Sequence, residues 1–106
     1  METPQWDYEQ ESELAEETKP KAKKPPLYKV LLHNDDYTTM DFVVHVLQTV
    51  FHRSPADAFR IMMAVHQQGV GMAGVFPFEI AEEKAERAIS MARANDFPLL
   101  CTVEEE

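Results

Sequence analysis

The stretch at residues 33–40 constrains the fold most, because the hydrophobic pattern of the chain changes there. Before it, LYKVLLH at residues 27–33 is rich in apolar residues, with Lys29 as its only charge, which predicts a mostly buried strand. After it, apolar residues recur at helical spacing: Met40, Val43, Leu47 and Val50. The stretch HNDDYTTM therefore connects a strand to a helix.

Start and stop signals predict three helices. Thr38 is expected to cap the first helix, with Asp41 in capping-box position, and this helix runs to about Phe51. Ser54 is expected to cap a second helix, which Pro55 opens and Gly69 ends.

The third helix is expected to begin at Pro77 and to end before Asn95 and Pro98. Small residues form its core-facing stripe: Ala81, Ala85, Ala88 and Ala92. Such a stripe lets a helix lie close to its neighbour.

Two more strands complete the prediction. One follows Gly69 and ends in Val75 and Phe76, and the other covers residues 99–103. The expected fold class is α+β in the order βααβαβ, a small sandwich of a three-stranded antiparallel sheet packed against three helices. We expect this domain to span residues 27–106.

The N-terminal region has a different composition. Residues 1–18 hold seven acids and no base, and residues 19–26 hold four lysines and three prolines. Too few apolar side chains are present to repay the ordering of the backbone, which predicts a disordered N-terminal arm at residues 1–26. Trp6 and Tyr8 are the exceptions and suggest a short contact motif.

Charge and composition exclude several classes of protein. A formal net charge of -9 argues against nucleic acid as a partner, because binding to phosphate requires the opposite sign. No apolar run approaches the roughly 20 residues of a membrane span, and the acidic N-terminus does not resemble a secretory signal. We expect a cytoplasmic, monomeric domain without cofactors.

Asn34, Asp35 and Asp36 place an amide and two carboxylates beside apolar residues. One such residue is explained by an Asx-type turn that leads into the Thr38 cap. The others suit a ligand whose positive charge is attached directly to an apolar group, such as a peptide N-terminus with a large apolar first residue. Both interpretations remain open on the residues alone.

The other chemically active side chains have ordinary alternatives. His66 fits a half-buried histidine as well as a ligand-binding one. The four histidines have no zinc-site spacing. Cys101 lies in a predicted strand, where a buried thiol is expected; a cysteine hydrolase would need it exposed near His66. The methionines could fill the core or line an adaptable pocket, and periodicity does not decide.

The sequence resembles the ClpS family of bacterial adaptors, which deliver N-degron substrates to an AAA+ unfoldase–protease. The resemblance spans about residues 27–103 in order and spacing. Its residues are Leu27-Tyr28-Lys29-Val30, Asn34-Asp35-Asp36-Tyr37-Thr38, Met40, Phe42-Val43, Val65-His66, Gly69, Gly74-Val75, Glu79, Ala81-Glu82, Lys84 and Pro98-Leu99.

The resemblance implies a pocket for a first residue of Leu, Phe, Tyr or Trp on a substrate protein. It implies that Asn34, Asp36 and His66 bind the free α-amino group, with Asp35 beside them. The side-chain pocket would be lined by Leu32, Thr38, Met40, Val43, Met62, Val65 and Leu99. Met40 would be the gate that excludes β-branched side chains.

The resemblance also implies a second partner, the N-terminal domain of a Clp AAA+ unfoldase. Glu79 and Lys84 match positions that dock onto that domain, and the arm would be the segment that the unfoldase engages. The chain departs from the family pattern at Thr39, where many members have Pro, and at Pro77, where Thr is common. A docking module like the C-terminal domain of the ribosomal stalk protein is the alternative on fold alone.

Overall fold

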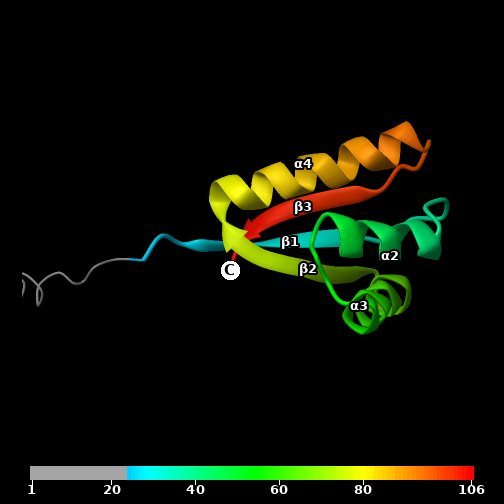
Figure 1. Ribbon diagram of the computed structural model, residues 1–106, viewed down its shortest axis with the longest axis horizontal. Helices are drawn as coiled ribbons and strands as arrows, with labels where there is room; N and C mark the ends of the chain where they lie inside the picture. The colour runs from blue at the N-terminus through cyan, green and yellow to red at the C-terminus, as the bar shows by residue number, and fades with distance from the viewer. Residues whose placement is uncertain (1–23) are drawn as a thin grey trace, which may run out of the picture.

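The computed structural model describes residues 24–106 and contains three strands and three helices (Figure 1). The elements are β1 (Leu27–His33), α2 (Met40–Thr49), α3 (Pro55–Gln68), β2 (Val70–Pro77), α4 (Phe78–Ala94) and β3 (Leu100–Glu105). The order βααβαβ is confirmed. Of the arm expected at residues 1–26, residues 1–23, with Trp6 and Tyr8, lie outside the described residues.

The sheet has the strand order β2-β1-β3, with both neighbouring pairs antiparallel. Its two faces differ in burial, as three neighbours in register show. Leu32 pairs with Gly71 on one side and Cys101 on the other, and all three are buried. The adjacent row is more accessible: Leu31, Met72 and Thr102. Side chains alternate across a strand, so the helices cover one face of the sheet, as the α+β prediction requires.

Helix α4 runs alongside β3 and contacts all three strands (Figure 1). Its buried residues are the predicted alanine stripe: Ala81, Ala85, Ala88 and Ala92. Helix α3 packs against β2 and against α2. It approaches β2 so closely that a Cβ atom at Gly71 would lie 2.7 Å from Cγ2 of Val65.

The predicted ends of α3 are confirmed. Ser54 accepts a hydrogen bond from the backbone N–H of Asp57, Pro55 is the first helical residue, and Gly69 ends the helix in the left-handed region at φ 91°. Only glycine adopts that conformation at low cost, so the helix stops there and the chain turns directly into β2.

The cap of α2 is Thr39, so the prediction of Thr38 was wrong. Thr39 Oγ1 accepts the hydrogen bond from the backbone N–H of Phe42, at 3.1 Å. Thr38 instead belongs to the turn before the helix, where its backbone N–H and its hydroxyl both donate to the carboxylate of Asp35. The helix ends at Thr49, slightly before the predicted Phe51.

Strand β3 begins at Leu100 rather than Leu99 and runs to Glu105, beyond the predicted end at Val103. The extension follows the length of its partner, because Glu105 pairs with Tyr28 near the start of β1. Pro77 immediately precedes α4 as its cap residue, without a side-chain cap hydrogen bond.

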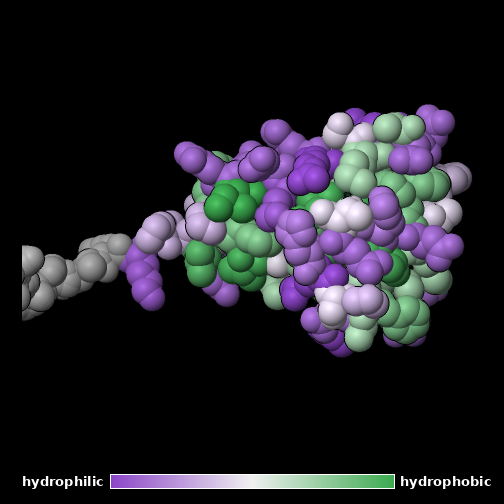
Figure 2. Space-filling view, in the orientation of Figure 1, coloured by the Kyte–Doolittle hydropathy of each residue, from purple (hydrophilic) through white to green (hydrophobic). Residues whose placement is uncertain are grey.

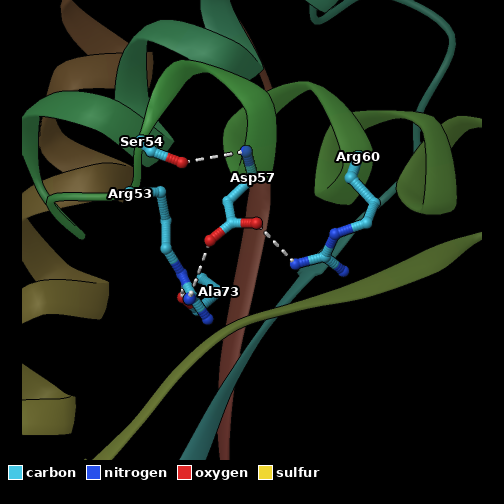
Figure 3. A network of polar contacts seen from close by, with 5 residues as sticks. All are labelled: Arg53, Ser54, Asp57, Arg60 and Ala73. Carbon is cyan, nitrogen blue, oxygen red and sulfur yellow. Dashed lines mark hydrogen bonds and ion pairs between the residues drawn. The ribbon is translucent and has the colours of Figure 1, made fainter.

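The edge strand β2 carries a bulge at Ala73. Val30 pairs with Gly74 and Leu31 pairs with Met72, which leaves Ala73 as the extra residue. Its carbonyl oxygen accepts a hydrogen bond from Nε of Arg53 at 2.9 Å. Asp57 lies 4.0 Å from Arg53 and also pairs with Arg60, 3.1 Å away (Figure 3).

Candidate functional site

A cavity of about 410 Å³ opens where the connection from β1 to α2 faces α3. Every residue from Asn34 to Met40 lines it, together with Val43 of α2 and Met62, Val65 and His66 of α3. The structure therefore brings together both halves of the predicted site, although more than 20 residues of chain separate them.

The floor of this cavity, defined as Val43, Met62 and Val65, is apolar and buried. These side chains are between 3% and 5% exposed and belong to the main hydrophobic core. Met40 stands at the mouth with 42% exposure, as the first residue of α2. An apolar side chain entering here would contact atoms that the core already holds in place.

The rim, defined as Asn34, Asp36 and His66, is polar and exposed. Within residues 24–106, none of the three side chains takes part in a hydrogen bond or an ion pair. An amide oxygen, a carboxylate and an imidazole therefore line one cavity and can accept hydrogen bonds from a ligand.

Asp35 differs from its neighbour Asp36. Its Oδ1 accepts from the backbone N–H groups of Tyr37 and Thr38, at 2.8 and 2.7 Å, and its Oδ2 accepts from the Thr38 hydroxyl at 2.8 Å. Partial burial favours the neutral acid, but these hydrogen bonds outweigh it and hold the pKa of Asp35 below its ordinary value. Asp35 is thus the residue whose presence the Asx-type turn explains, and its hydrogen bonds shape the loop that carries Asn34 and Asp36.

One backbone hydrogen bond joins the two sides of the cavity. The N–H of Asn34 donates to the carbonyl oxygen of Gly69 at 2.9 Å, so the loop begins against the end of α3. His66 lies in the last turn of that helix. The positions of Asn34 and His66 relative to each other are therefore set by main-chain geometry.

The residues that line the cavity differ from the expected set at four positions. Leu32 and Leu99 are fully buried core residues and do not line the cavity. Tyr37 and Thr39 do line it, and neither was among the residues that the sequence assigned to the pocket. Their position within the unbroken lining stretch Asn34–Met40 is the signal that could have identified them.

The two residues matched to docking lie on α4. Glu79 is exposed in its first turn, between Phe78 and Ile80, which are 49% and 43% exposed. Apolar residues gather on the surface at this start of α4 (Figure 2). Lys84 is half-buried: its Nζ donates to the carbonyl oxygen of Val50 at 2.9 Å and lies over the Phe76 ring. It therefore satisfies a carbonyl at the end of α2, in addition to any contact with a partner.

Cys101 does not have the environment of a nucleophile. It is buried beside Leu32, and that burial raises the pKa of its thiol to about 12. A thiol that stays protonated at neutral pH is a poor nucleophile. Within the described residues, no three His, Cys, Asp or Glu side chains are grouped to hold a metal ion, and no helix could cross a membrane.

Comparisons with known proteins agree with this geometry. The family model described as "ATP-dependent Clp protease adaptor protein ClpS" matches residues 23–102. The ClpS adapter protein of Maricaulis maris is 56% identical over 93 residues, which cover 88% of this chain and 85% of that protein. The corresponding protein of Desulfatibacillum aliphaticivorans is 58% identical over 86 residues, or 81% and 83% of the two chains.

A solved structure is also similar: Agrobacterium tumefaciens ClpS2 bound to L-phenylalaninamide. It superposes with a TM-score of 0.75 at 43% sequence identity, covering 78% of this chain and 100% of that one. The family match covers most of the chain, and the relatives are more than half identical over most of their own length. The chain therefore belongs to the ClpS family of Clp protease adaptors.

Proposed function

We propose that this protein binds other proteins through a bulky apolar N-terminal residue (Leu, Phe, Tyr or Trp) and delivers them to an AAA+ Clp unfoldase. The observation that carries the proposal is the single cavity that combines a buried apolar floor with an exposed polar rim. A first residue has the matching chemistry, because its ammonium group is one bond from the carbon that bears the side chain.

The ligand of the related structure supports this assignment. L-phenylalaninamide, bound to ClpS2 of Agrobacterium tumefaciens, has a free α-amino group, a benzyl side chain and an amide in place of the next peptide bond. It is thus the smallest mimic of an N-terminal phenylalanine.

In this proposal each part of the cavity recognises one feature of the ligand. Asp36, Asn34 and His66 accept hydrogen bonds from the ammonium group. The floor holds the side chain, Thr38 borders it, and Met40 acts as the gate against β-branched residues. Asp35 contributes its charge and the shape of the loop, since its oxygens already accept three hydrogen bonds. Leu32 and Leu99 support the pocket through core packing.

The free energies involved explain why binding needs both the apolar side chain and the free α-amino group. Burying a Leu or Phe side chain contributes roughly 1.5–3 kcal/mol. A hydrogen bond to a charged group contributes about 1.5–3 kcal/mol. Neither contribution alone reaches the roughly -8 kcal/mol of a micromolar complex. One buried side chain and three such hydrogen bonds together give roughly 6–12 kcal/mol, a range that includes this value.

N-acetylation tests the proposal directly. A fluorescent peptide that begins with Phe should bind, and the same peptide with an acetylated N-terminus should lose at least about a hundredfold in affinity, because the charge and two donors are gone. Fluorescence anisotropy measures both. A peptide that begins with Ser serves as the control for the side chain. Equal affinity of the free and acetylated Phe peptides would refute the proposed function.

Delivery requires a second surface, and the start of α4 is the proposed one. Glu79 presents a carboxylate between two exposed apolar residues, which is a suitable surface for docking onto the N-terminal domain of the unfoldase. Glu79→Lys should abolish binding to that domain while peptide affinity stays unchanged. Asp41→Lys, a change of an exposed acid in the first turn of α2, is the matched control.

The N-terminal arm is proposed to act in delivery alone. Deleting Met1 to Lys24 should leave peptide affinity and binding to the unfoldase domain intact but slow degradation of a Phe-initiated substrate. Equal loss of peptide binding and degradation would contradict this division. The protein acts in this scheme as an adaptor and not as an enzyme.

A further inference from the structure

A second cavity, of about 450 Å³, lies beside the first and has no role in the function proposed above. It is lined by Tyr37, Arg93, Asp96, Phe97 and Pro98. Tyr37 lines both cavities. The connection that leads into α2 and the connection from α4 to β3 lie at the same end of the molecule (Figure 1). The exposed side chain of Tyr37 therefore separates the two cavities.

The second cavity is held in a fixed position relative to the first. The Phe97 ring packs against Phe42 with 5.0 Å between centroids. Phe42 lies in the first turn of α2, next to Val43 of the floor, and its backbone N–H is held by Thr39. A wall of the second cavity thus packs on the helix that forms part of the first.

Backbone hydrogen bonds also fix the turn after α4. The N–H of Asp96 donates to Arg93 and the N–H of Phe97 donates to Ala92, at 3.0 and 2.8 Å. Asp96 adopts a left-handed conformation with φ 62°, unusual for a residue with a side chain. Phe97 and Pro98 therefore form a preorganised apolar wall.

Three exposed side chains in this cavity, those of Tyr37, Arg93 and Asp96, are available to a ligand. The Tyr37 side chain is 73% exposed although its backbone is held by Asp35. Arg93 is exposed, and within residues 24–106 its side chain makes no hydrogen bond or ion pair. A guanidinium group and a tyrosine ring beside each other can hold an aromatic side chain between them by stacking and cation–π contact.

We propose that this second cavity binds the third residue of the substrate and favours an aromatic side chain there. The inference rests on the proposed function of the first cavity. Side chains of an extended chain alternate, so when the first points into the protein, the second points away and the third points inward again. Two extended steps span roughly 7 Å, which is comparable to the width of the tyrosine side chain between the cavities.

The test compares two peptides, Phe-Ala-Trp and Phe-Ala-Ala, each with the same following sequence. Fluorescence anisotropy should show about three- to fivefold tighter binding of the Trp peptide to the wild-type protein. Arg93→Ala should remove most of this preference and leave the affinity for Phe-Ala-Ala unchanged. Arg87→Ala, also exposed on α4 but outside the cavity, is the matched control and should keep the preference.

The peptide Phe-Trp-Ala separates position from composition, and it should bind no better than Phe-Ala-Ala. The inference is overturned if the wild-type protein shows no preference, if Arg93→Ala keeps it, or if Trp works equally well at the second position. In each of those cases Phe-Ala-Ala still binds. Failure of Phe-Ala-Ala to bind, or equal binding of its acetylated form, would refute the proposed function instead.

Discussion

The rim and the floor of the first cavity border the same space but are built in different ways. Floor residues Val43, Met62 and Val65 are part of the core, so the forces that fold the domain also shape the pocket. Rim residues Asn34, Asp36 and His66 are exposed and make no side-chain hydrogen bond within the described residues.

This difference predicts that binding and stability can be separated at the rim but not at the floor. A rim side chain contributes little to the folded state and is available to a ligand. A floor side chain serves the core and the ligand together. Asp35 lies between these cases, because it is close to the rim but is engaged in internal hydrogen bonds.

The largest effect is expected at the floor. Met62→Ala should lower the free energy of unfolding by about 2–5 kcal/mol, because it removes buried atoms and leaves a void, and should also weaken binding of a Phe-initiated peptide. Urea denaturation and anisotropy measure the two quantities. Met63→Ala is the control on the same helix, since Met63 is only half-buried and does not line the cavity. A folded Met62→Ala protein with wild-type affinity would contradict the dual role of the floor.

The next effect is expected at the rim and in binding alone. Asp36→Ala should reduce peptide affinity about 10- to 150-fold, the value of one hydrogen bond between charged groups. The free energy of unfolding should change by less than about 0.5 kcal/mol, because the side chain is exposed. Asp41→Ala, an exposed acid in the first turn of α2 outside the cavity, should leave affinity unchanged. Loss of stability in Asp36→Ala would show that the rim is structural.

The smallest effect, and the one with a pH signature, is expected at Asp35. Asp35→Ala should lower the free energy of unfolding by about 1–2 kcal/mol at pH 7, because three donors lose their acceptor. The folded state lowers the pKa of this carboxyl below its ordinary value of 3.8. Its contribution is therefore fully present above that value and is lost as the pH falls through the folded pKa.

Urea denaturation of the wild-type and Asp35→Ala proteins at pH 7, 5 and 3 measures this difference. The two proteins should differ equally at pH 7 and 5 and converge below pH 3.8. A constant difference down to pH 3 would mean that the ionised carboxylate is not what stabilises the turn.

Much of this fold follows from local signals that tertiary structure does not override. The caps of α3, its end at Gly69 and the alanine stripe of α4 depend on spacing within one element, and all were predicted correctly. The cap of α2 was not, because two threonines compete for it and Asp35 binds Thr38. Periodicity contains no information about such a competition.

The site was predictable to the extent that it lies on a continuous stretch of chain. Residues 34–40 stood out as a group, whereas His66 was assigned to the same site only through the resemblance to the family. Only tertiary packing brings Tyr37 next to Arg93 and Phe97, so the second cavity has no sequence signature. The bond from Lys84 to the end of α2 joins residues 34 apart and is equally invisible.

Arg53 covers one backbone acceptor at an edge of the sheet. β2 is an edge strand, and an edge with free backbone groups is a template on which a further strand can assemble. At Ala73 the bulge interrupts the regular spacing, and the carbonyl oxygen already accepts a hydrogen bond from Arg53 (Figure 3). An incoming strand would have to displace a charged side chain and straighten the edge. Edge strand β2 is therefore a poor template for an incoming strand.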